Sequence, residues 1–313
     1  MTYVQAIVIA LFQGVTELFP VSSLGHSVLL PAWLGGNWQT LVTQSSQATS
    51  ESSFYLAYIV ALHVATAFAL LWFFRRDWLR IIRGLYVSSI RMLRVRHWDV
   101  QGPDERLAWM LVIATIPVGL TGLALEHTFR TLFAKPLAAA IFLFVNGLIL
   151  LGGEVLRRRV KARGASIGAT DHQIDPLSTK AAELSDSNIA KLGYKDALLV
   201  GTLQIAALFA GISRSGVTIV GGLWRGLDHE DAARFGFLLA TPVIFAAGVL
   251  KLPSLAGPAG AHIHGQVIVG FLVCGITAYL SVRFLVRYFE TRTLTPFAIY
   301  CLLVGAASVI RFA

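Results

Sequence analysis

The chain has 313 residues, of which 56% are hydrophobic and only 14% are charged, and its mean hydropathy is +0.68. Soluble globular domains carry about 25% charged residues, so this composition excludes a soluble globular protein and indicates a polytopic helical membrane protein. The formal net charge of +9 does not require a nucleic-acid partner, because the basic residues gather in alternate loops, which is the positive-inside pattern of membrane proteins.

The predicted elements begin with a broken helix over residues 4–34, which carries Glu17 and is interrupted at Pro20. A second broken helix is predicted over residues 197–223, and the polar segment 161–195 before it is interpreted as a flexible cytoplasmic connector. Six apolar runs have about the length that crosses a bilayer. These predicted spans are 54–74, 107–125, 137–153, 232–250, 267–285 and 296–310.

The basic segments predict the topology of the second half of the chain. Residues 75–106 and 157–195 belong in the cytoplasm, and so do the basic loops around 225–234 and 283–292. The spans between those loops then cross out and back. The broken helix 197–223 must therefore enter and return on the cytoplasmic side.

The first broken helix follows from the same argument with the opposite orientation. Residues 37–53 form a loop without Lys or Arg and are placed outside, so residues 4–34 enter and return on the outer side. The prediction is an all-α polytopic membrane protein of two inverted repeats, residues 1–160 and 196–313, joined by the connector 161–195. Each repeat has one re-entrant helical hairpin and three transmembrane helices.

The two broken helices align with each other without a gap. Gln13 matches Gln204, Ser22 matches Ser213, and Gly25 matches Gly216. The first copy holds an acid, Glu17, and an imidazole, His26, whereas the second holds a guanidinium, Arg214. Because broken helices of inverted repeats meet near the bilayer midplane, the three groups are predicted to form one divided site.

Arg214 carries the strongest functional signal. An arginine at the centre of a membrane helix costs about 2.5–3.5 kcal/mol even on the permissive insertion scale, so it is not expected to face lipid. It lies between Ser213 and Ser215 and next to Gly216, just after a helix break. Guanidinium, hydroxyl and backbone N–H donors at a helix N-terminus suit a phosphate. The alternative is a structural ion pair with Glu17.

Glu17 and Gln13 are four residues apart and share a helix face. The carboxylate can ligate a divalent cation, act as a base, or neutralise Arg214. Together the two side chains offer hard oxygen ligands for Mg²⁺ or Ca²⁺, although two oxygens do not establish a metal site.

Three further polar residues fall in the predicted spans and hairpins. His26 follows Ser22 and Ser23 by four and three residues, so it can take a proton from a hydroxyl or attack phosphorus; a hydrogen-bonded core histidine is the alternative. His63, in the middle of a span, is expected to give a supporting hydrogen bond. Asn146 is expected to serve helix packing.

The segment Thr-Glu17-Leu-Phe-Pro-Val-Ser-Ser-Leu-Gly-His26, together with Gly211-Ile-Ser-Arg-Ser-Gly-Val-Thr218, resembles the undecaprenyl-diphosphatase (bacitracin-resistance) family. The resemblance extends to Pro296-Phe-Ala-Ile-Tyr300 near the end of the chain. It implies hydrolysis of undecaprenyl diphosphate to undecaprenyl phosphate and inorganic phosphate, which recycles the lipid carrier of cell-wall synthesis. It also implies bacitracin resistance, a divalent cation, and location in the bacterial inner membrane with the site toward the periplasm.

The family's motifs transfer residue by residue onto this chain. Catalytic roles are expected for Glu17, Ser23, His26 and Arg214, with nucleophile, base and metal ligand left open among the first three. Diphosphate binding is expected from Ser22, Ser213, Arg214, Ser215, Gly216 and Thr218. The chain departs from the family at Leu24, where a Ser or Thr is common, so that hydroxyl cannot be essential here.

Two other functions were weighed against this one. A transporter or flippase of a phosphorylated polyprenyl lipid would use the same architecture and the same site. The type-2 phosphatidic-acid phosphatases are set aside, because they need a histidine after the Ser-Arg element and residues 217–223 contain none. The expected partners are the polyprenyl diphosphate substrate and membrane lipids, and a homodimer is left open.

Overall fold

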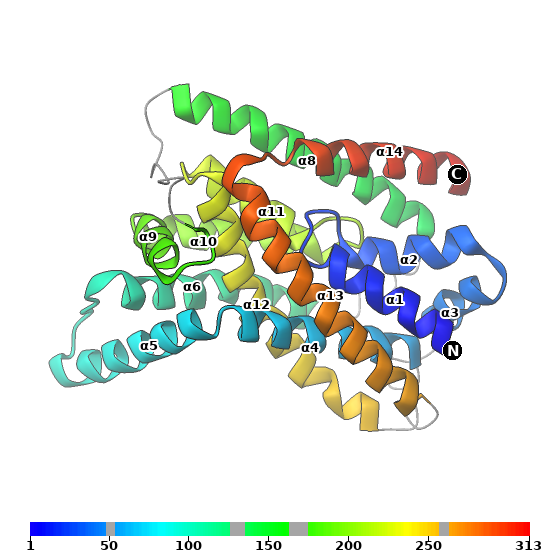
Figure 1. Ribbon diagram of the computed structural model, residues 1–313, viewed down its shortest axis with the longest axis horizontal. Helices are drawn as coiled ribbons and strands as arrows, with labels where there is room; N and C mark the ends of the chain where they lie inside the picture. Colours follow the sequence, from blue (N-terminus) through cyan, green and yellow to red (C-terminus); the bar gives the residue numbers. More distant parts are fainter. Residues whose placement is uncertain (48–53, 126–134, 163–174, 257–262) are drawn as a thin grey trace.

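Six membrane-length helices form the body of the molecule in the computed structural model, which describes residues 1–47, 54–125, 135–162, 175–256 and 263–313 (Figure 1). All regular structure in these residues is helical. The six helices are α4 (Phe54–Phe73), α6 (Gly102–Ala124), α8 (Pro136–Ala162), α12 (His229–Ala256), α13 (His264–Thr291) and α14 (Thr295–Phe312). Each covers one of the six predicted spans, which confirms the prediction of an all-helical polytopic membrane protein.

The two broken helices are present where the sequence predicts them. The first consists of α1 (Tyr3–Thr16) and α2 (Ser23–Leu34). The second consists of α10 (Tyr194–Leu203), the short 3₁₀ helix η1 (Gln204–Leu208) and α11 (Arg214–Trp224). Both α2 and α11 begin at a serine N-cap, because the Ser22 and Ser213 hydroxyls accept hydrogen bonds from the N–H groups of Gly25 and Gly216. The aligned serines, Ser22 and Ser213, therefore both cap the N-terminus of the helix that follows the break.

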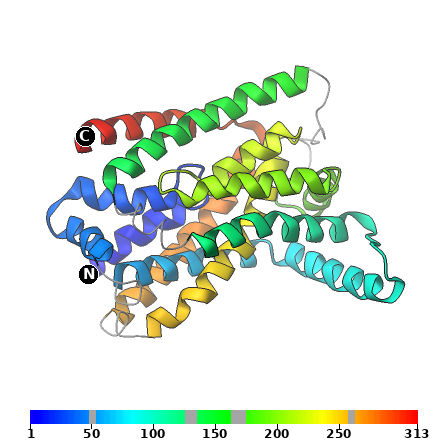
Figure 2. The same ribbon diagram turned by 180° about the vertical axis from the view of Figure 1, so that it is seen from behind.

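The helices of the two halves interdigitate around these breaks. Helix α1 of the first half packs along α13, the second span of the second half. Helix α10 of the second half packs along α6, the second span of the first half. Helices α4 and α12, the first spans of the two halves, contact each other, and so do α8 and α14, the third spans (Figures 1 and 2). Such an exchange of partners is what a repeat requires, and the inverted relation itself stays a prediction.

Two segments predicted as loops are helices instead. Residues 36–47 form α3 (Gly36–Gln47), and the basic segment after α4 forms α5 (Arg75–Val95). Helix α5 is amphipathic: Ile81 is buried, whereas Leu79 and Leu93 are more than two-thirds exposed. The loop prediction for α5 was wrong because the charge of this segment excludes a membrane span but not a helix that packs against α6.

The second part of the connector is also folded, in contrast to the predicted flexible chain. Residues Thr179–Ile189 form α9, and Asp186 on it is 1% exposed. The Asp186 carboxylate accepts hydrogen bonds from Arg80 of α5 at 2.7 Å and from Arg234 of α12 at 2.9 Å. A polar sequence thus folds because its acid satisfies two arginines of the helical bundle. Residues 163–174 lie outside the described residues.

We expect Asp186→Asn to lower the stability of the protein markedly. Loss of one partner of a buried ion pair costs about 3–5 kcal/mol, because it leaves buried charge without compensation. Thermal unfolding in detergent measures the effect, and hydrogen exchange of the α9 amides localises it. The matched control is Glu183→Gln, which removes an exposed carboxylate from the same helix. An Asp186→Asn protein as stable as this control would show that the ionic contacts do not dock α9.

Candidate active site

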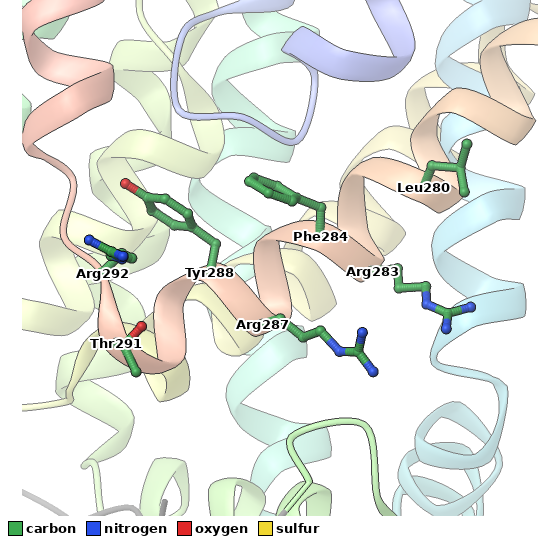
Figure 3. Close-up of a pocket in the computed structure, with 7 residues that line it drawn as sticks. All are labelled: Leu280, Arg283, Phe284, Arg287, Tyr288, Thr291 and Arg292. Atoms are coloured by element: carbon green, nitrogen blue, oxygen red, sulfur yellow. The ribbon is translucent and has the colours of Figure 1, made fainter.

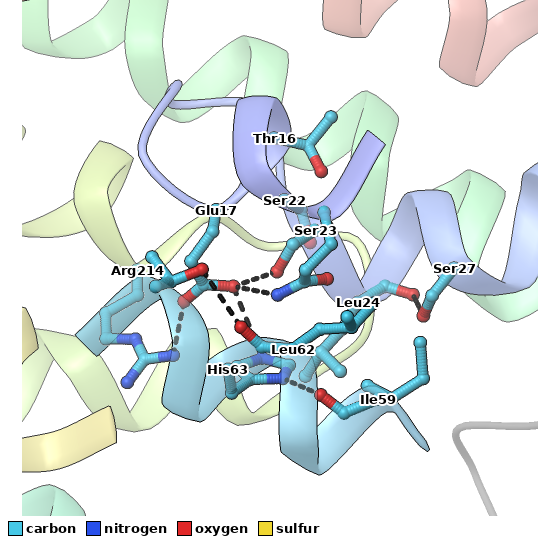
Figure 4. A network of polar contacts seen from close by, with 12 residues as sticks. Thr16, Glu17, Ser22, Ser23, Leu24, Ser27, Ile59, Leu62, His63 and Arg214 are labelled. Atoms are coloured by element: carbon cyan, nitrogen blue, oxygen red, sulfur yellow. Dashed lines mark hydrogen bonds and ion pairs between the residues drawn. The ribbon is translucent and has the colours of Figure 1, made fainter. Parts of the chain in front are cut away.

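The buried carboxylate of Glu17 is the centre of a polar cluster built from four helices (Figure 4). Arg214 of α11 lies 2.8 Å from Glu17 Oε1, and His63 of α4 lies 3.2 Å from Oε2. Gln13 of α1 donates to Oε2 at 2.9 Å, and the Ser23 hydroxyl at the start of α2 also donates to Oε2. The structure therefore brings together Gln13, Glu17, Ser23 and Arg214, as the sequence predicts.

The contact between Ser23 and Glu17 has a direct chemical meaning. A serine hydroxyl hydrogen-bonded to a buried carboxylate has the arrangement that nucleophile–base pairs use. Arg214 beside the same carboxylate supplies the positive charge that a phosphate requires. Its side chain is 19% exposed and uses one of five N–H donors on Glu17, so the guanidinium retains capacity for an oxyanion.

His63 contacts Glu17 directly, at 3.2 Å from Oε2, which is consistent with the supporting role expected for it. Its Nδ1 lies 2.8 Å from the carbonyl oxygen of Ile59. A carbonyl oxygen only accepts, so Nδ1 carries a proton and Nε2 faces the carboxylate. His63 Nε2 is thereby aimed at the same carboxylate oxygen, Oε2, that Ser23 and Gln13 contact. The signal in the sequence was a histidine in the middle of an otherwise apolar span.

His26 is buried in a different setting from the one predicted. Its Nδ1 lies 2.7 Å from the carbonyl oxygen of Ser22, so by the same reasoning Nδ1 donates. Its Nε2 lies 2.8 Å from the hydroxyl of Tyr300 on α14, and the two rings stack with centroids 5.7 Å apart. The imidazole thus fixes the start of α2 instead of reaching the Ser23 hydroxyl.

The two helix breaks are clamped to each other by hydrogen bonds and close packing. Asn146 of α8 accepts from the Ser213 N–H and donates to the Pro20 carbonyl, each at 2.9 Å. The Ser22 hydroxyl accepts from the N–H of Gly211 at 3.1 Å. Gly211 has φ +114°, and a Cβ there would lie 2.5 Å from the Ala139 carbonyl oxygen, so only glycine fits. Asn146 therefore positions both breaks, whereas the sequence indicated only helix packing.

The other residues expected to bind diphosphate serve the first turn of α11. The Ser213 and Ser215 hydroxyls lie 3.0 Å apart, and Ser215 also donates to the carbonyl of Phe19 at 3.2 Å. The Thr218 hydroxyl donates to the carbonyls of Arg214 and Ser215 within its own helix. Gly216 allows a close approach, since a Cβ there would lie 3.1 Å from a Leu150 methyl group. These groups hold Arg214 in place and form no direct bond to Glu17.

A divalent cation would find few protein ligands in this cluster. Within the described part of the chain, no group of three or more His, Cys, Asp or Glu side chains could hold a metal ion. Gln13 Oε1, however, is buried without a hydrogen-bond partner next to Glu17. Mg²⁺ typically binds one or two protein oxygens and takes its other ligands from phosphates and water. The residues fit a cation held in that manner.

Comparison with known proteins identifies the family of this chain. Residues 6–307 match the family described as "Bacitracin resistance protein BacA". The chain belongs to this family. "Undecaprenyl-diphosphatase 2" of Frankia alni and "Undecaprenyl-diphosphatase" of Mycolicibacterium paratuberculosis are each 56% identical to it, across all of this chain and 98% of theirs. "Undecaprenyl-diphosphatase 2" of Chromobacterium violaceum is 40% identical across 99% of both chains. The resemblance drawn from the two motifs is thereby confirmed.

We expect Asn146→Ala to destabilise the protein and to abolish the alignment of the two breaks. It leaves the Pro20 carbonyl and the Ser213 N–H buried without partners, at about 1–3 kcal/mol each. Thermal unfolding in detergent measures the loss. Asn146→Asp is the matched variant, because it keeps an acceptor for Ser213 but loses the donor to Pro20 and buries a carboxylate against that carbonyl, so it should also unfold at a lower temperature than the wild type. Equal stability of all three proteins would contradict the clamp.

Proposed function

We propose that this protein hydrolyses undecaprenyl diphosphate to undecaprenyl phosphate and inorganic phosphate, and so recycles the lipid carrier of cell-wall synthesis. Membership of the bacitracin-resistance family and the names of the relatives support this activity and the resistance to bacitracin that goes with it. The single observation that carries it is the Ser23 hydroxyl bonded to Glu17 beside Arg214. That trio supplies nucleophile, base and phosphate-binding cation in one buried place.

Arg214 binds the diphosphate in this proposal. Arg214 is the first residue of α11, where the positive end of the helix dipole adds to the charge of its guanidinium. Its fork of N–H donors suits the paired oxygens of a phosphate. Fixed positive charge in a buried site stabilises the charge that develops in the transition state.

Ser23 then attacks the outer phosphorus. As its oxygen bonds to phosphorus, its proton passes to Glu17 and the bond to the bridging oxygen breaks, so undecaprenyl phosphate leaves. Water next attacks the phosphoserine; Glu17 returns the proton to Ser23, and both protons of the water leave with the dihydrogen phosphate ion. Glu17 thus ends each turnover ionised, with atoms and charges balanced.

The two histidines support this sequence in different ways. His63, fixed by the Ile59 carbonyl, contacts Glu17 Oε2 and so orients the carboxylate toward Ser23. His26, held by Tyr300, bonds the Ser22 carbonyl and fixes the turn on which Ser23 sits. Their contributions are positional, because neither imidazole is hydrogen-bonded to the Ser23 hydroxyl.

A divalent cation, Mg²⁺ or Ca²⁺, completes the proposal. Gln13 Oε1 and Glu17 are the oxygens of this chain that would contact it. When bound, such a cation spreads the negative charge of the diphosphate. The chain's own part is to leave the Gln13 amide oxygen without a protein partner while the amide nitrogen of the same side chain donates to Glu17.

We place the protein in the bacterial inner membrane with the site toward the periplasm. The basic residues of α5 and of the connector support a cytoplasmic position for that end of the bundle. The substrate is a polyprenyl diphosphate lipid. The proposed chemistry is complete within one chain, and a homodimer is an untested alternative.

A transporter or flippase of a phosphorylated polyprenyl lipid is the second candidate. The paired helix breaks favour it, because broken helices at a repeat interface are a transporter feature. Release of inorganic phosphate by the purified protein separates the two functions, since a pure carrier releases none.

We expect Glu17→Gln to lower kcat by about 10²–10⁴, the usual contribution of a general base. The measurement is phosphate release from a C55 diphosphate in detergent. Glu183→Gln, an exposed carboxylate on α9, is the control and should keep full activity. Arg214→Ala should lose activity as well, and Arg214→Lys should restore only part of it, because lysine lacks the fork. Near-native turnover of a folded Glu17→Gln or Arg214→Ala protein would contradict the assignment.

The cation proposal predicts a specific effect of Gln13. We expect a chelator to abolish phosphate release and Gln13→Ala to raise the Mg²⁺ or Ca²⁺ concentration needed for half-maximal activity by about tenfold, or 1.4 kcal/mol. Gln266→Ala, a glutamine remote from Glu17 that bonds Met1, is the control. An unchanged cation requirement in Gln13→Ala would remove Gln13 from the site.

A further inference from the structure

An open, basic cavity lies at the C-terminal end of α13, on a different part of that helix from its contact with α1 (Figure 3). Its volume is about 440 Å³. Three arginines line it with two aromatic rings: Arg283, Arg287, Arg292, Phe284 and Tyr288. Figure 3 shows the Arg283 and Arg287 guanidiniums on one side of the helix, with Arg292 beyond Tyr288. The cavity therefore presents concentrated positive charge around an aromatic surface.

The arginines of this cavity differ in their pairing from other arginines at the same end of the bundle. Arg80 and Arg234, at the same end of the bundle, are ion-paired with Asp186. In contrast, the described residues include no carboxylate that forms an ion pair with Arg283, Arg287 or Arg292. Arginine is the side chain best suited to bind phosphate oxygens in pairs. Three unpaired guanidiniums around one cavity thus favour an anionic ligand.

An apolar stripe leads along α13 to this cavity. Its residues recur every four positions, so they form one continuous ridge that winds around the helix, and each is more than half exposed: Ile268, Leu272, Ile276, Leu280 and Phe284. In a membrane protein, exposed aliphatic side chains at this spacing face the hydrocarbon of the bilayer. The last two residues of the stripe also line the cavity. Acyl-chain contacts and phosphate contacts are therefore continuous on one helix.

The end of the bundle that carries the cavity is the basic one. The Leu294 N–H, just after α13, and His229, at the start of α12, both bond Glu154 near the end of α8. Arg234 on α12 in turn bonds Asp77 of α5 and Asp186 of α9. The cavity thus lies with α5 and α9, the end that the positive-inside rule places at the cytoplasmic leaflet.

We propose that this cavity is a binding site for an anionic glycerophospholipid of the cytoplasmic leaflet. Arg283 and Arg287 bind the headgroup phosphate, Arg292 adds a third positive charge, and the acyl chains lie along the stripe that ends at Phe284. Basic pockets beside membrane helices at this leaflet bind anionic headgroups in this way. The site is separate from the Glu17 cluster and does not depend on the activity proposed for it.

One aromatic contact links the lipid site to the loop that carries Glu17. The Phe284 ring stacks on Phe19, in the loop that carries Glu17, with centroids 5.8 Å apart and planes within 4°. A lipid held at Phe284 therefore packs next to the first helix break. The bound lipid is expected to stabilise the protein as well as to be retained by it.

The test is a titration of the delipidated full-length protein in detergent with phosphatidylglycerol or with phosphatidylcholine, read by native mass spectrometry. Each arginine near an anionic surface contributes about fivefold to affinity, that is about 1 kcal/mol. The double variant Arg283→Gln, Arg287→Gln should therefore bind phosphatidylglycerol about thirtyfold more weakly and lose the preference for it over phosphatidylcholine.

The matched control is Arg83→Gln, Arg94→Gln, which removes two exposed arginines from α5 at the same end of the bundle. It should keep wild-type preference for phosphatidylglycerol. Equal weakening in both double variants would overturn the proposal in favour of diffuse charge, and so would equal wild-type affinity for the two lipids. Tighter wild-type binding of a C55 monophosphate than of phosphatidylglycerol, weakened in the Arg283→Gln, Arg287→Gln variant, would overturn the assigned ligand. Thermal unfolding of each variant without lipid shows that the fold is retained.

Discussion

A buried carboxylate in an apolar molecule must be matched by donors and positive charge, and the arrangement of this protein around Glu17 depends on that constraint. An ionised side chain in a low-dielectric interior is tolerated only when it is paired and hydrogen-bonded. Arg214 of the second broken helix and His63 of α4 contact the Glu17 carboxylate. Gln13 and Ser23 of the first broken helix donate hydrogen bonds to it. The same contacts that neutralise Glu17 therefore assemble the site from four separate helices.

The backbone around the cluster is arranged to keep these groups in place. Each helix break exposes polar main-chain groups at a depth where lipid offers no partner. Asn146 and the Ser22 hydroxyl bond the exposed groups of one break to the other, and Gly211 gives the room for that approach. Catalytic geometry and fold stability thus rest on the same few residues. An enzyme of this kind needs no large moving domain to bring acid, hydroxyl and guanidinium together.

The sequence was a good guide where hydrophobic periodicity and charge placement determine structure. The six spans, the two helix breaks and the meeting of Glu17 with Arg214 all follow from such patterns. Tertiary partners were harder to foresee. A lone histidine in a span, His63, gives no sign of which residue it will face, and the position of His26 depends on Tyr300, 274 residues away. Helices α5 and α9 were missed because their stability comes from docking on the bundle and not from their own polar sequences.

The central claim is that Glu17 takes the proton of Ser23 so that Ser23 attacks phosphorus. The direct measurement is rapid quenching of the enzyme during turnover of a C55 diphosphate labelled at the outer phosphate, followed by mapping of the labelled peptide by mass spectrometry. The account predicts a transient phosphoserine at Ser23, which is absent in Ser23→Ala. Label on His26 would contradict attack by Ser23. Full turnover by a Ser23→Ala variant without any labelled protein would contradict it as well.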